Sequence, residues 1–284
     1  MADTKQREPQ HQDHQPGTRD DMSPPPSDSA AAYKGSGKLT GKAALITGGD
    51  SGIGRATAIA FAKEGADVCV IYLEESKDAK DTQKLIEQAG GQALLVQGDL
   101  QSRDFCRMAA EKAAKAFGGL DIIVNNAAVQ FPEEDFLDIT PENLVRTFQT
   151  NILSMFHVTQ AALPHLRDNG CIVNTASITA FQGNPKLIDY SSTKGAIVAF
   201  TRALAKSLVK QGVRVNAVAP GPVWTPLIPA SFDAEDVAKF GADNPMGRAA
   251  TADEIAPAFV FLASDDARFI TGQVIHVNGG EHFG

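Results

Sequence analysis

The chain has 284 residues, of which 43% are hydrophobic and 21% charged, which is ordinary for a globular protein and enough for a sizeable core. Its formal net charge of −8 argues against a nucleic-acid or anionic-membrane partner. The sequence contains no apolar run of about 18 residues and no apolar leader segment, so it predicts a cytoplasmic protein without a membrane span or a secretory signal.

The first 38 residues differ in composition from the rest of the chain. They are rich in Pro, Gln, Asp, Ser and His and contain almost no large apolar side chains. Such a segment buries too little surface to offset the entropy of ordering it, so we expect a disordered or loosely docked arm over residues 1–38. The arm could be a solubilising leader, or it could wrap a neighbouring subunit through Tyr33.

From residue 39 onward, short apolar runs alternate with helical patterns. The expected strands are Ala43–Thr47, Asp67–Tyr72, Ala93–Gln97, Leu120–Asn125, Cys171–Thr175, Val213–Ala219 and Gln273–Val277. The expected helices lie near 53–64, 77–89, 102–117, 141–168, 189–211 and 251–263. Consecutive apolar or β-branched positions are typical of strands buried on both faces. The alternation predicts one α/β domain over residues 39–284, a Rossmann-type, doubly wound parallel sheet of about seven strands with helices on both faces.

A glycine-rich turn directly follows the first expected strand. From Thr47 it reads TGGDSGIG, and a helix is expected to begin near Arg55. Glycine permits positive φ angles and lets the backbone approach a pyrophosphate, while the start of the helix offers free N–H groups and the positive end of its dipole. A plain connection between strand and helix is the alternative. The order of strand, turn and helix favours nucleotide binding by Gly48, Asp50, Ser51, Gly52, Ile53 and Gly54.

Tyr190 and Lys194 are four positions apart on an expected helix, so their side chains share one face. A free phenol has a pKa of about 10 and exchanges protons poorly near neutrality. We expect the Lys194 ammonium to lower the pKa of Tyr190 enough for the phenol to trade protons with a substrate. Taken alone the pair is weak evidence, because an exposed tyrosine beside a solvated lysine is common.

The segment after the sixth expected strand is irregular. It has four prolines between positions 220 and 229 and mixes aromatic with polar residues as far as Asn244. Because open α/β sheets bind their ligands beyond the carboxyl ends of the strands, we expect a substrate lid over about residues 223–247.

Further motifs occur in order along the chain: Asn125-Asn126-Ala127-Ala128, Asn151, Ser177, Tyr190-Ser-Ser-Thr-Lys194 and Pro220-Gly221. Together with the TGxxxGxG turn, they resemble the short-chain dehydrogenase/reductase family over about residues 40–284. Ala128, where many members have glycine, and Asp50 are mild departures. The segments YKGSGKL and GGDSGIGRA are similar to a subgroup with an N-terminal extension, described as glucose/ribitol dehydrogenase-like or general stress oxidoreductases.

The resemblance implies an NAD(P)-dependent oxidoreductase that transfers a hydride between the nicotinamide and a small alcohol or carbonyl substrate. Ser177 would hydrogen-bond the substrate oxygen, and Asn151 would hold a water that relays protons through Lys194. Tyr190 and Lys194 would also contact the cofactor. The other cofactor-binding residues that the resemblance implies are Tyr72, Leu73, Asp99, Leu100, Asn125, Asn126, Ala127, Ala128, Pro220, Gly221, Val223 and Thr225.

The end of the second expected strand bears on the choice between NAD and NADP. An acid there would hold the ribose hydroxyls, and a base would meet a 2′-phosphate. The family's acid would align with Tyr72 and its base with Leu73 or Ser51, so neither group is present. The glutamates at positions 74 and 75 should repel a 2′-phosphate, so NAD(H) is favoured, while Arg55 keeps NADP(H) possible.

The substrate can be predicted only as a class. The expected pocket rim comprises residues 129–131, 178–184 and 224–240. There Phe131, Phe181 and Trp224 mix with amide side chains, which could suit a sugar or polyol. Two alternatives remain: a reductase of β-ketoacyl groups on a carrier, and a catalytically idle, nucleotide-sensing stress protein on the same fold. No Cys/His cluster has zinc spacing, so no metal site is expected.

The family commonly forms homotetramers through its two long helices, which are expected here near 141–168 and 189–211. Apolar residues on these helices could belong to an interface or to the core: Phe148, Ile152, Phe156, Ile197 and Phe200. We therefore expect a homotetramer.

Overall fold

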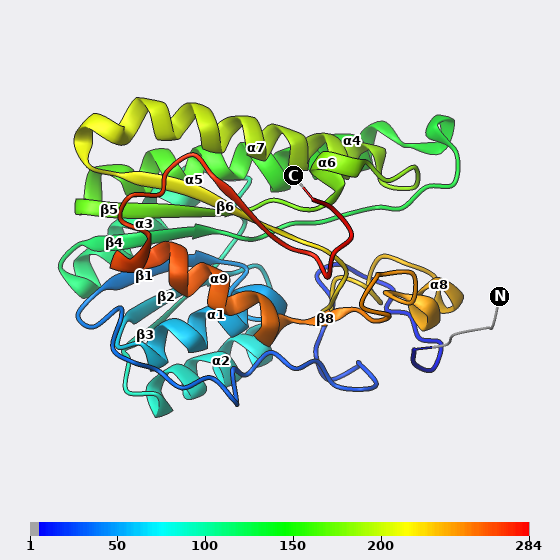
Figure 1. The fold of residues 1–284 in the computed structure, drawn as a ribbon, viewed down its shortest axis with the longest axis horizontal. Coiled ribbons are helices and arrows are strands. Elements are labelled where there is room, and N and C mark those ends of the chain that lie inside the picture. The colour runs from blue at the N-terminus through cyan, green and yellow to red at the C-terminus, as the bar shows by residue number, and fades with distance from the viewer. Residues whose placement is uncertain (1–5, 284) are drawn as a thin grey trace.

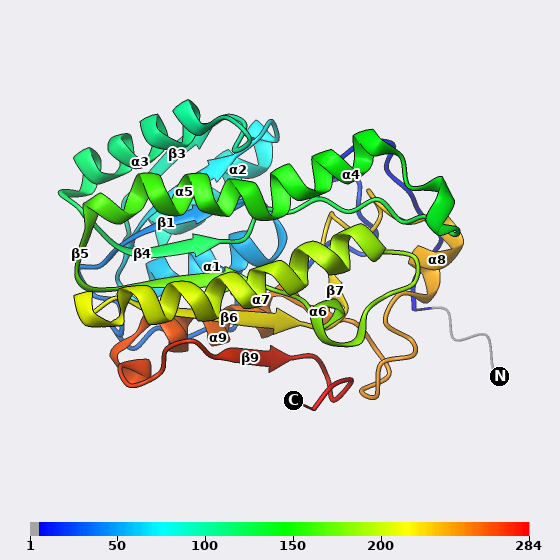
Figure 2. The ribbon, with the colours of Figure 1, turned by 90° about the horizontal axis from the view of Figure 1, so that it is seen from above.

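Seven parallel strands form the central sheet of the molecule (Figures 1 and 2). The computed structural model describes residues 6–283. The strands are β1 (Ala43–Thr47), β2 (Asp67–Tyr72), β3 (Ala93–Gln97), β4 (Leu120–Asn125), β5 (Leu166–Thr175), β6 (Arg214–Pro220) and β9 (Val274–Val277). Their order is β3-β2-β1-β4-β5-β6-β9, and all neighbours pair in parallel. This order confirms the Rossmann-type sheet predicted from the sequence.

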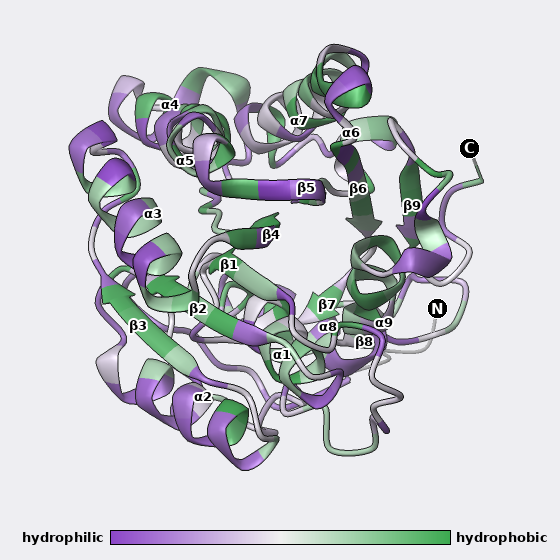
Figure 3. Ribbon diagram, turned by 90° about the vertical axis from the view of Figure 1, so that its left-hand side faces the viewer, coloured by the Kyte–Doolittle hydropathy of each residue, from purple (hydrophilic) through white to green (hydrophobic). Residues whose placement is uncertain are grey.

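Helices cover both faces of the hydrophobic sheet (Figure 3). The strands carry apolar side chains on both faces, and each face packs in a separate core cluster. One face packs against α1 (Gly52–Lys63), α2 (Ser76–Gln88) and α9 (Ala252–Ala263), and the other against α3 (Arg103–Phe117), α5 (Ser154–Ala162) and α7 (Ile188–Leu208). Within β1, Ala44 and Ile46 pack toward the first group, whereas Leu45 packs toward the second. Among residues 6–283, no helix is both long enough and apolar enough to cross a bilayer.

The carboxyl ends of the strands all face the end of the molecule that carries α8 (Ala234–Lys239) (Figure 2). The connections that leave β1 and β4 lead to opposite edges of the sheet, which opens a crevice between these two strands. The segment predicted to be an irregular lid lies at this end. It contains α8 and the short strand β7 (Val223–Trp224), which pairs with β8 (Ala250–Thr251).

The helix expected over residues 141–168 is interrupted. It consists of α4 (Pro141–Phe148), the π-helical segment η2 (Gln149–Leu153), α5 and the 3₁₀ turn η3 (Leu163–His165). Pro164 lies in η3, where its missing N–H removes a helical hydrogen bond, and β5 begins at Leu166. The prediction was therefore wrong for residues 166–168, which belong to a strand. The short helices η1 (Phe136–Asp138), α6 (Thr179–Gln182) and η5 (Asp265–Ala267) were not predicted, nor was α8 within the lid.

Residues 6–38 of the N-terminal arm lie along the outside of the domain and reach the lid (Figure 1). Its Asp28 side chain is fully buried and accepts hydrogen bonds from Arg19 at 2.8 and 2.9 Å. Tyr33, considered above as a contact to another subunit, donates its hydroxyl to Glu64 of the same chain. The structure thus differs from the disordered or loosely docked arm that the composition predicted. The arm has too few apolar residues to form a core of its own. Hydrogen bonds and ion pairs between polar side chains hold it in place instead. The division of the chain at residue 38 stays a prediction.

Candidate active site

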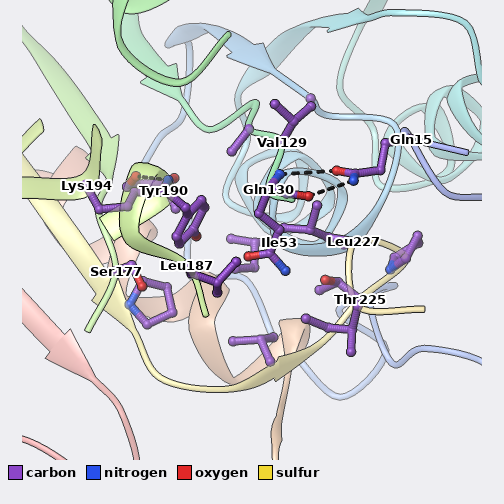
Figure 4. Close-up of a pocket in the computed structure, with 18 of the residues that line it drawn as sticks. Gln15, Ile53, Val129, Gln130, Ser177, Leu187, Tyr190, Lys194, Thr225 and Leu227 are labelled. Atoms are coloured by element: carbon purple, nitrogen blue, oxygen red, sulfur yellow. Dashed lines mark hydrogen bonds between the residues drawn. The ribbon is translucent and has the colours of Figure 1, made fainter. Parts of the chain in front are cut away.

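A cavity of about 710 Å³ lies at the carboxyl ends of the strands, in the size range of small-molecule sites (Figure 4). It brings together most of the residues expected to bind a cofactor: Gly48, Asp50, Ser51, Gly52, Ile53, Tyr72, Leu73, Asp99, Leu100, Asn126, Ala127, Ala128, Pro220, Gly221, Val223 and Thr225. Ser177, Tyr190 and Lys194 line the same cavity. Gly54, Asn125 and Asn151 do not line it.

The glycine turn after β1 has a backbone conformation that side chains at the glycine positions would prevent. Gly48 and Gly52 have φ angles of +60° and +52°, a region that favours glycine. A Cβ on Gly54 would lie 2.0 Å from the Gly48 carbonyl oxygen, so Gly54 closes the turn from behind. Asn126 Nδ2 donates to the carbonyl oxygens of Thr47 and Gly48, both at 3.1 Å, and fixes the turn to β4.

Helix α1 begins at this turn and offers a site for an anion. The side chain of Ser51, the N-cap residue, makes no capping hydrogen bond. The Gly52 N–H donates to the Asp28 carboxylate of the arm at 3.3 Å. The following N–H groups have no acceptor within the helix and lie at the positive end of its dipole. The bare turn and the helix start therefore fit the pyrophosphate of a dinucleotide.

The part of the cavity near the end of β2 is acidic. Burial raises the pKa of Asp50 to about 6, and burial with repulsion from Asp50 raises the pKa of Glu75 to about 7. Arg55, which could have met a 2′-phosphate, does not line the cavity. Its buried guanidinium donates to Thr82 Oγ1 at 2.6 Å and to the Asp78 carbonyl oxygen at 3.3 Å. The sequence could not tell this structural role from a cofactor-binding one.

Tyr190 and Lys194 lie side by side on α7, with Ser177 just past the end of β5 (Figure 4). Lys194 Nζ lies 5.2 Å from the centroid of the Tyr190 ring and donates to the Thr175 carbonyl oxygen at 2.9 Å. Both α7 side chains are almost fully buried, at 9% and 1% exposure. The arrangement places a phenol, an ammonium group and the Ser177 hydroxyl in one enclosed region of the cavity.

The pKa values correct one expectation about this pair. Burial raises the pKa of Tyr190 to about 12, although a hydrogen bond with Ser177 opposes this, and burial lowers the pKa of Lys194 to about 7. The sequence argument had Lys194 lowering the pKa of Tyr190. It overlooked that removing both groups from water disfavours both charged forms, so that Lys194 holds its own proton less strongly.

Asn151 lies in the π-helical segment η2, buried behind the cavity wall. Its Oδ1 accepts from the Val129 N–H at 2.8 Å. Its Nδ2 donates to the Val129 carbonyl oxygen at 2.8 Å and to Thr193 Oγ1 at 3.2 Å. Because both amide protons are used, Asn151 ties a wall residue of the cavity to the helix that carries Tyr190. Asn125 is likewise internal, and its Nδ2 donates to Asn174 at 2.9 Å.

The aromatic side chains predicted at the pocket rim lie elsewhere. Phe181 packs against His276 with ring centroids 4.5 Å apart, and Phe131 lies under the Arg146 guanidinium. Trp224 lies under the Arg7 guanidinium of the arm at 4.0 Å. The aromatic side chains of the lid that do line the cavity are Phe232 and Phe240. Amide side chains are present as predicted, at Gln130, Gln182 and Asn184.

Sequence reasoning missed several lining residues. Residues 15–17 of the arm form part of the wall, as do Arg146, Lys186 and Lys239. The arm was treated as lying outside the domain because its composition carries no signal for docking. Arg146 lies in α4, Lys239 in α8 and Lys186 in the loop before α7, and no local pattern links them to the motifs that the sequence shows.

Comparison with known proteins places these features in a family. The family model described as enoyl-(acyl carrier protein) reductase matches residues 48–282. The chain is 57% identical over 277 residues to the uncharacterized oxidoreductase YhdF of Bacillus subtilis, covering 98% of this chain and 96% of that protein. This alignment must include most of the arm. General stress protein 39 of the same organism is 55% identical, covering 95% of each chain. Glucose and ribitol dehydrogenase of Daucus carota is 48% identical, covering 99% of this chain and 98% of that one.

Two solved structures have the same fold. A short chain dehydrogenase from Burkholderia cenocepacia in complex with NADP has a TM-score of 0.80 and 32% identity, covering 86% of this chain and 98% of that one. The 3-ketoacyl-(acyl-carrier-protein) reductase from Brucella melitensis complexed with NADH has a TM-score of 0.80 and 35% identity, covering 86% of this chain and 100% of that one.

Proposed function

Because this chain belongs to the short-chain dehydrogenase/reductase family and is an oxidoreductase that acts on small alcohol or carbonyl substrates with NAD(P), we propose that Ser177, Tyr190 and Lys194 carry its chemistry. The observation that supports this assignment is their convergence in one cavity with the glycine turn. Tyr190 and Lys194 share α7, Ser177 follows β5 and the glycine turn follows β1, so the fold brings three separate parts of the chain together.

When bound, the nicotinamide supplies or accepts the hydride, and the chain's residues manage position and protons. Ser177 orients the substrate oxygen by a hydrogen bond. Tyr190 gives its phenolic proton to that oxygen in reduction and takes it back in oxidation. Lys194, when charged, makes the phenol a stronger acid. Asn151 is a positioning residue that fixes Val129 and α7 through its three hydrogen bonds.

The pKa of Lys194 predicts the pH dependence of carbonyl reduction. Since its pKa lies near 7, Lys194 carries its charge below that pH and loses it above. Without that charge the Tyr190 phenol is a weaker acid, so kcat for reduction should fall as the pH rises from 6 to 9. Initial rates at saturating cofactor measure this. Lys194→Arg, which stays charged over this range, should flatten the profile. A parent profile that is level from pH 6 to 8 would contradict the role of Lys194.

The substrate class proposed here is a sugar or polyol. Gln182 and Asn184 supply amide groups at the cavity, and Phe232 and Phe240 add apolar faces from the lid. The relative from Daucus carota, which aligns over 98% of its length, is named glucose and ribitol dehydrogenase. A β-ketoacyl substrate is the second candidate, because a 3-ketoacyl-carrier reductase shares the fold at 35% identity.

Absorbance at the nicotinamide band over a panel of sugars, polyols, aldehydes and ketoacyl thioesters tests these substrate classes. Turnover of sugars or polyols supports the proposal, and turnover of ketoacyl thioesters alone selects the second candidate. Cofactor binding without turnover of any compound would indicate the idle, nucleotide-sensing protein instead.

NAD(H) is the cofactor that we propose. The acidic side chains Asp50 and Glu75 line the cavity, and Arg55 is engaged by Thr82 and Asp78. We expect NADH to bind at least about tenfold more tightly than NADPH, since carboxylates near the ribose repel a 2′-phosphate. Fluorescence titration at pH 8 measures both constants, and Glu75→Gln should narrow the gap. Equal or tighter binding of NADPH would reverse the assignment.

A homotetramer built on α4, α5 and α7 is the proposed assembly. Ile152 and Ile197 are buried within the chain and belong to the core. Phe156 is 42% exposed and packs on Phe200 with centroids 4.6 Å apart, which leaves an apolar surface on these helices. Light scattering at micromolar concentration should give four times the chain mass, and a monomer would contradict the proposal.

A cytoplasmic location stays a prediction, and three buried, free cysteines fit a reducing compartment.

A further inference from the structure

The N-terminal arm contributes directly to the wall of the cavity. Gln15, Pro16 and Gly17 line it, more than a hundred residues before Gln130 and Pro226, which they contact. The cavity has a volume of about 710 Å³ in the structure that includes the arm. The arm therefore borders the space that a ligand would occupy and does not fill it.

Gln15 fastens the arm to one side of the cavity. Its Nε2 donates to the Gln130 carbonyl oxygen at 2.7 Å, and its Oε1 accepts from the Gln130 N–H at 3.2 Å. Arg146 Nη2 donates to the Gln15 carbonyl oxygen at 3.2 Å. Figure 4 shows this pairing on the side of the pocket away from Tyr190 and from the catalytic end of the cavity.

Gly17 brings the arm against the opposite wall. A Cβ on Gly17 would lie 2.5 Å from the Pro226 carbonyl oxygen and 2.8 Å from Ala230 Cβ, so the backbone passes in direct contact with the lid. Pro226 in turn approaches the glycine turn, since its Cδ lies 3.9 Å from where a Gly52 Cβ would be. The arm thus crosses from the loop after β4 to the lid above the phosphate-binding turn.

Charged groups lock the same arm to the turn itself. Asp28 is fully buried, pairs with Arg19 at 2.8 Å and with Arg55 Nε at 3.4 Å, and accepts the Gly52 N–H. Arg55 belongs to α1, so this cluster connects the arm to the helix whose start would face a bound pyrophosphate. A buried ion cluster of this kind breaks at a high cost once one partner is lost, so it holds the arm in one position.

The lid is fastened to the arm as well. Trp224 Nε1 donates to the Pro24 carbonyl oxygen at 3.0 Å, and Met22 packs in an apolar cluster with Trp224 and Val237. The arm therefore links three parts that a bound dinucleotide would touch: the wall at Gln130, the glycine turn and the lid.

We propose that residues 15–17 of the arm are a nucleotide-binding element that encloses the pyrophosphate half of the bound dinucleotide and slows its release. The inference rests on the proposed function, because it requires the dinucleotide to occupy this cavity. Closing contacts of this kind act mainly on dissociation, since related complexes differ more in their off-rates than in their on-rates. The arm is thereby part of the binding site of this chain and more than a leader.

Two matched glutamine variants test the proposal. Gln10 makes the same pair of amide contacts as Gln15, but to the Ser23 backbone within the arm and away from the cavity. Gln15→Ala should raise the NADH dissociation rate about tenfold in stopped-flow displacement, while Gln10→Ala leaves it unchanged. Gly17→Ala, which must push the arm off Pro226, should act like Gln15→Ala. Circular dichroism and the melting temperature confirm that each variant is folded.

Hydrogen exchange of the parent protein gives a reading that needs no variant. If the arm touches the dinucleotide, saturating NADH must slow amide exchange in a peptide over residues 10–22, because coupling between the two is reciprocal.

Unchanged exchange together with an unchanged off-rate in Gln15→Ala would overturn the proposal. Tighter NADH binding by Gln15→Ala would also overturn it, by showing that the arm obstructs the site. A change confined to the KM of the carbonyl substrate would assign the arm to the substrate instead. Parent protein that binds no nicotinamide nucleotide would refute the proposed function itself.

Discussion

Tyr190→Phe is expected to lower kcat by about 10²- to 10⁴-fold while the affinity for NADH stays within about twofold. The substitution keeps the ring, which is 9% exposed and packs beside Lys194, and removes only the hydroxyl. In reduction the developing alkoxide would then have no phenolic proton to accept, although Ser177 still orients it. Steady-state rates and a fluorescence titration separate the loss of chemistry from any loss of binding.

Tyr33→Phe is the matched control for this variant. It removes a hydroxyl that is also hydrogen-bonded, to Glu64, but lies on the arm outside the cavity. It should change the melting temperature and leave kcat as in the parent. A Tyr190→Phe protein with parental kcat would remove the phenol from the mechanism, whatever the control shows.

Gly54→Ala is expected to weaken NADH binding by about 100-fold or more. The added Cβ would lie 2.0 Å from the Gly48 carbonyl oxygen and 2.6 Å from Asn126 Nδ2, so the turn must move. Backbone N–H groups would then miss the pyrophosphate, and two charge-assisted hydrogen bonds at about 1.5 kcal/mol each account for the loss. Isothermal titration or fluorescence measures the affinity.

Gly195→Ala provides the comparison for that change. Gly195 is a helical glycine, and apart from its own helical turn no atom lies within 4 Å of its ideal Cβ, so the same methyl group should fit and leave the affinity unchanged. Melting temperatures of both variants distinguish a displaced turn from an unfolded chain. A folded Gly54→Ala protein with parental affinity would show that the turn does not hold the nucleotide.

The sheet could be predicted closely because its strands are buried on both faces. Runs such as Ala43–Thr47 and Asp67–Tyr72 are apolar at nearly every position, and the structure ends these strands at the predicted residues. The glycine turn was also predictable from local sequence, since its glycines have a recognisable spacing and the turn lies between a strand and a helix. Family motifs then supplied Ser177, Tyr190 and Lys194, which the structure brings into one cavity.

What the sequence did not predict depends on contacts between distant segments. Asp28 is fully buried and pairs with Arg19 and Arg55, and no local sequence pattern near Asp28 predicts these partners. The rim aromatics were misplaced for the same reason, as Trp224 packs against Arg7 of the arm. The pKa of Tyr190 also followed from burial, which a spacing of four residues does not reveal.

Deuteride transfer is the most direct measurement of what this site does. NADH carrying deuterium at both C4 positions would be incubated with the aldehyde and ketose members of the panel, and the alcohols analysed by mass spectrometry. We predict one deuterium on the carbinol carbon of a sugar- or polyol-type product with the parent protein, and almost none with Tyr190→Phe over the same time. Bound NADH that passes its label to no compound of the panel would contradict the assignment of Ser177, Tyr190 and Lys194 as catalytic residues.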